Sequence, residues 1–125
     1  MPSKKPTARF SDIIYNIDAI ARYTAGMDEQ GFIADDLRVD AVERCLSRLS
    51  EVATKIGTLA EQLELTLPWR KIRDFGNFLR HEYDTIERTD LWAITRDELT
   101  PLRAASERAI KRIHQGLDRD PPEAT

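Results

Sequence analysis

Four stretches of the sequence place apolar residues three and four positions apart, the spacing that gives a helix one apolar face. The first covers about residues 8–25 and ends at Gly26, which suits the left-handed position after a helix. The second follows Asp35 or Asp36, either of which can cap it, and ends at Gly57. Its apolar positions form the longest stripe in the chain: Val42, Cys45, Leu46, Leu49, Val52, Ala53 and Ile56.

Prolines mark the starts of the other two helices. Pro68 is tolerated at the first position of a helix and poorly inside one, so a helix is predicted to start near Pro68 or Trp69, after a weak helical turn at 59–67. Its apolar face is Trp69, Ile72, Phe75, Leu79, Tyr83 and Ile86. After the polar break at 87–90, a short segment leads to a last helix from near Asp97 or Glu98, with Pro101 in its first turn. The inward residues of this last helix are Leu99, Leu102, Ala105, Ala109, Ile113 and Leu117.

This pattern predicts an all-α protein. No segment shows the alternation of a strand, and residues 27–36 are loop-like. Four main helices joined by short connections favour an up-and-down bundle of four to five helices. A chain of 125 residues is long enough for one core, so we predict a single domain over 8–117. Residues 1–7 and 118–125 are predicted to be flexible tails.

The charges exclude a surface that attracts phosphate everywhere, since 19 basic residues face 22 acidic ones and the net charge is −3. Two segments still carry a local basic excess, and each could bind phosphate or be ordinary solvated helix surface. The first segment, 70–81, contains Arg70, Lys71, Arg73 and Arg80. The second, 103–112, contains Arg103, Arg108, Lys111 and Arg112.

Cys45 is the only cysteine, so the chain can form neither an intrachain disulfide nor a cysteine-based zinc site. No metal site and no cofactor is predicted. The sequence lacks an apolar run of about 20 residues and an apolar secretion signal near its start. We therefore expect a cytoplasmic protein that does not enter a membrane.

His81 is placed on a polar face of the third predicted helix, opposite the apolar face. Two lines of polar residues cross that face and meet at Asn77. One line is Arg70, Asp74, Asn77 and His81, and the other is Arg73, Asn77 and Arg80. Histidine can take or give a proton near neutral pH, and arginine offers a fixed cation to a phosphate. Because RNA supplies its own 2′-hydroxyl nucleophile, this group could support RNA cleavage without a metal, and the alternative is ordinary helix surface.

Tyr83 lies about 200° around an ideal helix from His81. It can join the same site only if the helix ends or bends there, or if a partner chain completes the site. Its spacing alone predicts a half-buried core residue. The second histidine, His114, falls in a helix rich in Lys and Arg and is predicted to be a surface residue.

The segment PWRKIRDFGNFLRHEYDTIERTDLWAITRDELTPL, residues 68–102, resembles the motif region of HepT-like proteins. These are small all-α HEPN ribonuclease toxins paired with minimal nucleotidyltransferase (MNT) antitoxins. The resemblance extends upstream to FSDIIYNIDAIARYTAG and DAVERCLSRLSEVATKI. It implies a HEPN-like homodimer that cleaves RNA through His81 without a metal. It also implies that the antitoxin partner transfers AMP from ATP to Tyr83 and so blocks the site.

One motif position departs from the pattern of these proteins. They carry an arginine five residues before the histidine, where this chain has Gly76. Arg80, directly before His81, or Arg73, further back, would then replace that cation. The alternative is a HEPN-fold binding protein without catalysis, which pairs with a nucleotidyltransferase or binds nucleotide or RNA.

Overall fold

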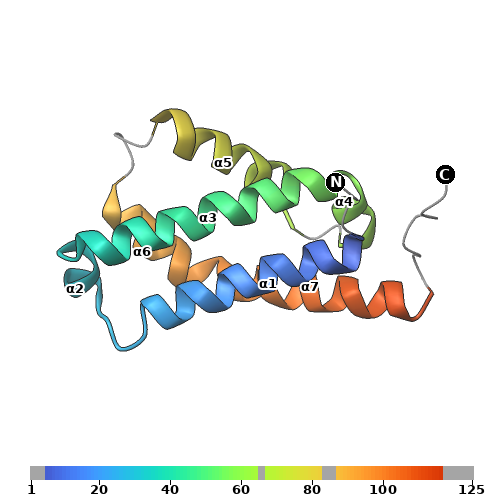
Figure 1. The fold of residues 1–125 in the computed structure, drawn as a ribbon, viewed down its shortest axis with the longest axis horizontal. Helices are drawn as coiled ribbons and strands as arrows, with labels where there is room; N and C mark the ends of the chain where they lie inside the picture. Colours follow the sequence, from blue (N-terminus) through green and yellow to red (C-terminus); the bar gives the residue numbers. More distant parts are fainter. Residues whose placement is uncertain (1–4, 65–66, 83–86, 117–125) are drawn as a thin grey trace.

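The computed structural model describes residues 5–64, 67–82 and 87–116, apart from the side chains at 77, 78 and 80–82. Every regular element in this part of the chain is an α-helix (Figure 1). The helices are α1 (Pro6–Tyr23), α2 (Glu29–Ile33), α3 (Asp36–Ile56), α4 (Leu59–Leu63), α5 (Trp69–Glu82), α6 (Arg88–Asp97) and α7 (Leu99–His114). The all-α prediction is confirmed for the described residues.

The ends of the long helices lie close to the residues that predicted them. The Asp35 carboxylate accepts a hydrogen bond from Arg38 N at 3.0 Å and so caps α3. Gly57 ends the same helix with a φ of +67°, and Gly26 follows α1 with a φ of +73°. This left-handed backbone favours glycine because it has no Cβ.

Two helices differ from the sequence prediction. The loop-like stretch 27–36 contains α2, which Asp28 caps by accepting a hydrogen bond from Gly31 N at 2.8 Å. The short segment before the last helix is the ten-residue helix α6, which begins at Arg88 inside the predicted polar break. These two helices pack on each other, with the rings of Phe32 and Trp92 5.3 Å apart. Both helices are too short for their periodicity to stand out in the sequence.

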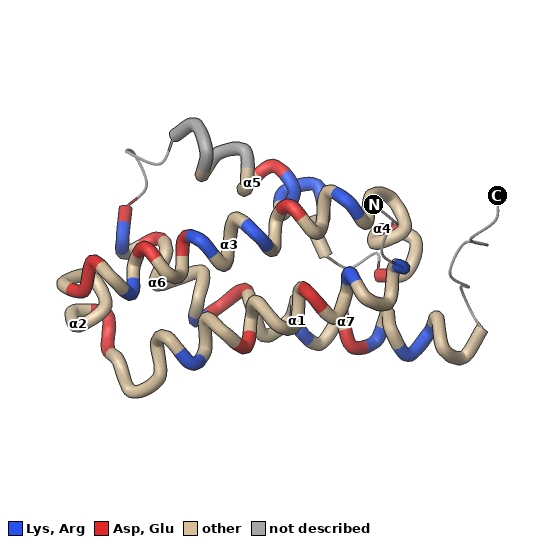
Figure 2. Tube along the Cα trace, viewed as in Figure 1, with Lys and Arg blue, Asp and Glu red and all other residues tan. Residues whose placement is uncertain are grey.

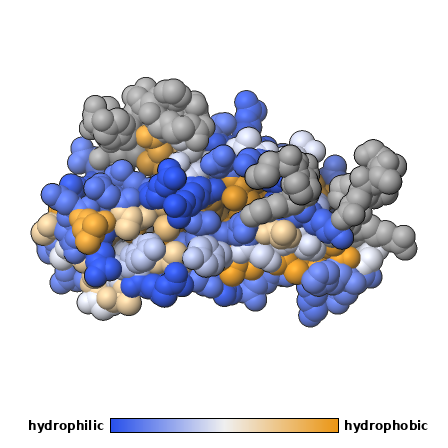
Figure 3. Space-filling view, viewed as in Figure 1, coloured by the Kyte–Doolittle hydropathy of each residue, from blue (hydrophilic) through white to orange (hydrophobic). Residues whose placement is uncertain are grey.

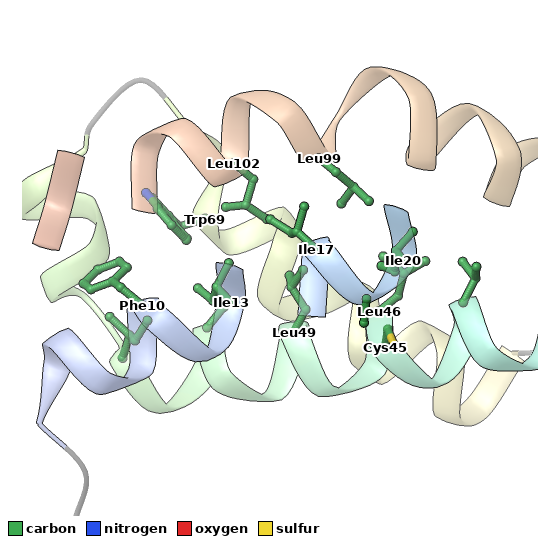
Figure 4. Packing of buried hydrophobic residues seen from close by; sticks show 14 of the residues in the cluster. Phe10, Ile13, Ile17, Ile20, Cys45, Leu46, Leu49, Trp69, Leu99 and Leu102 are labelled. Carbon is green, nitrogen blue, oxygen red and sulfur yellow. The ribbon is translucent and has the colours of Figure 1, made fainter. Parts of the chain in front are cut away.

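The four long helices α1, α3, α5 and α7 alternate in direction, as an up-and-down bundle requires (Figure 1). Helices α1 and α3 form the centre, α5 packs on α3, and α7 packs on α1. Side chains from all four helices meet in one core (Figure 4). Its labelled members are Phe10, Ile13, Ile17, Ile20, Cys45, Leu46, Leu49, Trp69, Leu99 and Leu102.

None of the helices in the described ranges is long and apolar enough to cross a membrane.

Candidate active site

The start of α5, the helix that carries the motif, is fixed by Trp69. This indole is 1% exposed, and its Nε1 donates a hydrogen bond to the backbone oxygen of Glu64 at 2.9 Å. Its ring also packs edge-on against Phe10 of α1, with ring centroids 6.2 Å apart. A buried Trp with a satisfied N–H holds a helix end firmly, so α5 has a defined origin relative to the core.

The segment before α5 is held by arginines of α7. Arg108 donates to Glu64 Oε1 from Nε at 2.9 Å and from Nη2 at 2.6 Å. Arg112 donates to the backbone oxygen of Leu63 at 2.7 Å. Another arginine of α7, Arg103, donates to the carboxylate of Asp18 in α1 at 2.8 and 3.1 Å. Three of the four basic residues at 103–112 therefore join α7 to its neighbours, an arrangement that neither of the two sequence-based alternatives described.

A serine of α3 contacts the backbone of α5 directly. Ser50 is 2% exposed, and its hydroxyl oxygen lies 2.5 Å from the carbonyl oxygen of Ile72 and 3.0 Å from that of Arg73, the two acceptors for its single proton. The same oxygen accepts a hydrogen bond from Gly76 N at 2.8 Å. Ser50 thus bonds to both Ile72 O and Gly76 N, the two groups that an ideal helix joins to each other.

Gly76 is buried at this contact between α3 and α5. At this position the backbone of α5 approaches the Ser50 side chain of α3 to hydrogen-bond distance. Close backbone approach is one of the few reasons that offset the cost of glycine inside a helix, about 1 kcal/mol relative to alanine. The structure therefore gives Gly76 a packing role at the position where the sequence comparison expected a catalytic arginine.

Arg73 is also engaged in packing. Its Nη1 lies 2.6 Å from Glu61 Oε1 of α4, and its side chain is 20% exposed. The ion pair links α5 to α4 and directs the guanidinium of Arg73 towards α4. Asp74 and Arg70, from the predicted polar lines, are exposed on α5.

The remaining predicted site residues are placed only in part. Asn77, Arg80 and His81 belong to α5, while their side chains lie outside the described part of the structure. Tyr83 lies outside the described residues altogether. The structure thus fixes the helix that carries the motif, and the roles of these four residues stay predictions.

Glu43 of α3 is a candidate that the sequence pattern did not single out. Ser50 is level with residues 72–76 of α5, and the two helices run in opposite directions (Figure 1). At 1.5 Å per residue, Glu43 lies about 10 Å from Ser50 along α3, level with the backbone of α5 near residue 81. Its carboxyl is half-buried, and burial together with the charge of Asp40 raises its pKa above the usual range. A half-buried acid level with the motif end of α5 is recognisable only once the register of the two helices is known.

We expect Glu43→Gln to raise the Tm of the protein at pH 7, because burial and the charge of Asp40 raise the pKa of this carboxyl on folding and so disfavour its charged form. Stability from such a group is complete below its unfolded pKa of about 4.3 and is lost as pH rises through the folded value. The gain in Tm over wild type should therefore vanish near pH 4, as measured by thermal unfolding at both pH values. A gain that is equal at pH 4 and pH 7 would contradict the titration argument.

Among the residues whose side chains are described, no three His, Cys, Asp or Glu residues are grouped as ligands for a metal ion.

Comparison with known proteins identifies the family. The model of the family described as Ribonuclease HepT-like matches residues 13–109, which include the later part of α1, all of α3 and α5, and most of α7. The chain therefore belongs to the HepT-like ribonuclease family, as its motif predicted. The match spans both the Ser50 contact and the motif end of α5.

Three curated relatives are similar over most of their length. The protein named "Putative RNase MJ0125" of Methanocaldococcus jannaschii is 25% identical over 92% of this chain and 99% of its own. "Putative RNase MJ1216" of the same organism is 26% identical over 94% of this chain and 97% of its own. "Probable ribonuclease HepT" of Thermococcus cleftensis is 25% identical over 80% of this chain and 91% of its own. No solved structure gives a significant match.

Proposed function

We propose that this protein is a metal-independent endoribonuclease that acts in the cytoplasm with His81 as its catalytic residue. The observation that carries the proposal is the family match over 13–109, which includes His81 on helix α5. The contacts of Trp69 and Ser50 support it, because they hold that helix rigidly against the core. Catalytic groups need such a scaffold, since small misplacements cost large factors in rate.

The proposed reaction is transesterification within the RNA chain. The 2′-oxygen forms a bond to the adjacent phosphorus while the bond from phosphorus to the 5′-oxygen breaks. His81 transfers a proton in this step, either from the attacking hydroxyl or to the leaving oxygen. An arginine next to it stabilises the charge that develops on the phosphate, and Asn77 adds a hydrogen bond.

The proposal includes a toxin–antitoxin pair. A nucleotidyltransferase of the MNT type would transfer AMP from ATP to the hydroxyl of Tyr83, releasing pyrophosphate, and the bulky anionic adduct would block the RNA site. The alternative function is a HEPN-fold protein without catalysis that binds the same partner, nucleotide or RNA. The observation that favours this alternative is Gly76, because it occupies the expected arginine position and is buried against Ser50.

The test of the proposed function is RNA cleavage by the purified protein in excess EDTA. We expect single-stranded RNA to be cut, with products that end in a cyclic phosphate. The binding alternative predicts intact RNA under the same conditions. Cleavage that disappears with EDTA and returns with a divalent ion would overturn the metal-independent mechanism.

Arg80 and Arg73 have different expected roles in this reaction. Arg73 is bound to Glu61, so we assign the catalytic cation to Arg80, which directly precedes His81. Arg80→Ala should lower the initial cleavage rate about a hundredfold, the scale of losing one transition-state donor. Arg73→Ala should leave the rate within a few-fold and lower the free energy of unfolding by about 1 kcal/mol. Two variants with unchanged rates would refute the assignment.

A homodimer is part of the proposal, and an apolar groove of about 440 Å³ supports it. The groove lies between α5 and the junction of α6 with α7, and its floor comes from α3. Its apolar lining includes Leu46, Leu49, Ile72, Phe75, Leu99 and Leu102. Lys71 stands on the α5 side, whereas Asp97 and Glu98 stand on the opposite side. Two copies related by a twofold axis would place the basic side of each groove against the acidic side of the other.

We expect light scattering to give a mass near twice 14.4 kDa for the wild type. Lys71→Glu should shift the protein towards the monomer, because it sets like charges against each other across the axis. The variant that combines Lys71→Glu with Asp97→Lys and Glu98→Lys should restore the dimer. A wild-type monomer at working concentrations would contradict the dimer, whereas a dimer insensitive to these changes would place the interface elsewhere.

A further inference from the structure

Acids hold many of the arginines in the described part of the chain. These ion pairs join side chains of different helices or adjacent turns, and their nitrogen–oxygen distances range from 2.6 to 3.8 Å. The pairs are Arg38 with Asp35, Arg73 with Glu61, Arg88 with Asp36, Arg103 with Asp18, and Arg108 with Glu64. An arginine in such a pair has little remaining attraction for an external anion.

Three exposed arginines are different. Arg22 of α1 and Arg44 and Arg48 of α3 form no ion pair or hydrogen bond with any described residue. Asp40, one turn before Arg44, is exposed as well, yet no ion pair joins the two. Glu51, which follows Arg48, is paired with Lys55 at 3.5 Å.

The three arginines are exposed on α3 and α1, two helices that pack against each other. Cys45 of α3 is buried, and the charges of both Arg48 of α3 and Arg22 of α1 are close enough to lower the pKa of its thiol, against the larger effect of burial, which raises it. Arg44 precedes Arg48 by one helical turn and therefore lies beside it. Figure 2 shows Lys and Arg positions alternating with Asp and Glu positions along α3, and Figure 3 shows hydrophilic atoms over the middle of the molecule.

The three arginines extend away from the motif. The register set by Ser50 places Arg44 level with the motif end of α5, and Arg48 one turn further along α3. Arg22 belongs to α1, and α3 lies between α5 and α1 (Figure 1). The order from the motif outward is therefore Arg44, Arg48 and Arg22.

We propose that Arg44, Arg48 and Arg22 form a track that binds the phosphates of single-stranded RNA leading away from His81. The inference rests on the proposed function, because it assigns the substrate's path to the same site. The net charge of −3 makes such a local surface necessary, since the protein as a whole repels a polyanion. Arg44 and Arg48 form no ion pair with a described acid, and Arg22 acts on Asp18 only through its charge, while Asp18 is bound to Arg103. A guanidinium can donate two parallel hydrogen bonds to phosphate oxygens.

The test measures binding without cleavage. The probe is a fluorescent single-stranded RNA that is methylated at every 2′-oxygen, which removes the nucleophile, and anisotropy gives its Kd at several salt concentrations. One phosphate contact on a single strand contributes about 0.7 to the slope of log K against log salt, or about fivefold in affinity at 0.1 M salt. Each of Arg22→Gln, Arg44→Gln and Arg48→Gln should therefore weaken binding about fivefold. The triple variant should weaken it about a hundredfold and reduce the slope by about 2.

The matched control removes three basic side chains elsewhere, through Arg38→Gln, Lys55→Gln and Lys111→Gln. This control variant changes the net charge by the same amount as the Arg22, Arg44 and Arg48 triple variant. Its affinity for RNA should stay close to that of wild type. Equal weakening in the two triple variants, or no binding by wild type, would overturn the track. Cleavage of unmethylated RNA, measured in parallel, keeps this inference separate from the proposed function. If binding depends on the three arginines but RNA is not cleaved, the track is supported and the nuclease proposal is refuted. If RNA is cleaved but the triple variant binds RNA as tightly as wild type, the nuclease proposal is supported and the track is refuted.

Discussion

His81→Ala should abolish RNA cleavage by the purified protein, lowering the initial rate at least a thousandfold in excess EDTA. The expected loss is large because the proposed mechanism uses this imidazole for the proton transfer, and general acid–base catalysis contributes about a hundred- to ten-thousandfold. The pH dependence of the rate should also change. Wild-type cleavage should follow a titration near neutral pH, where histidine ionises, and the residual rate of the variant should not.

His114→Ala is the matched control for this experiment. His114 is the last residue of α7, and its side chain is exposed. The substitution removes the second imidazole of the chain and should leave cleavage and Tm unchanged. If the preparations of wild type and His81→Ala cut RNA at the same rate, the catalytic proposal is wrong and the binding alternative stands.

Gly76→Arg should destabilise the protein by about 3 kcal/mol. Overpacking a buried contact costs about 1–3 kcal/mol, and a displaced hydroxyl that leaves buried polar groups unpaired costs about 1–3 more. Gly76 is buried, and its N–H donates to the hydroxyl of Ser50, so we expect an arginine side chain at this position to disturb the contact between α3 and α5. Thermal unfolding should show a Tm lower by roughly 10 °C. If Gly76→Arg simply restored the arginine of the family motif, the variant would instead stay folded and cleave RNA faster than wild type.

Asp74→Arg provides the control for arginine on the same helix. Asp74 is exposed, so this substitution should change the free energy of unfolding by less than about 0.5 kcal/mol. A double-mutant cycle tests the mechanism itself. In a Ser50→Gly background, the cost of Gly76→Arg should fall by more than about 1 kcal/mol, because the side chain that opposes position 76 is gone. A stable Gly76→Arg variant that cleaves RNA faster than wild type would contradict the packing argument, because it would show that a side chain at residue 76 can reach the proposed RNA-cleavage site.

Helical spacing predicted which polar residues share one face of α5, but not which residues of other helices contact them. It grouped His81 with Asn77, Arg73 and Arg80 because spacing gives the direction of each side chain around one helix axis. It could not reveal that Glu61 of α4 holds Arg73, since that pair depends on how a second helix is placed. The same limit applies to Glu43, which is level with residue 81 only through the packing of α3 against α5.

The sequence by itself determined the class of the protein and its principal helices. Asp35, Gly57 and Pro68 act within a few residues of the backbone that they shape, and apolar residues at helical spacing leave few alternatives to a helical bundle. The motif likewise indicated the family that the match over 13–109 shows.

The tertiary structure decided which charged side chains are free of ion pairs among the described residues and what Gly76 contacts. Arg103 and Arg108 are engaged by acids of other helices, Arg48 is not, and Gly76 admits the hydroxyl of Ser50. These contacts join residues far apart in the chain, and their energies depend on distances that only the packed helices fix.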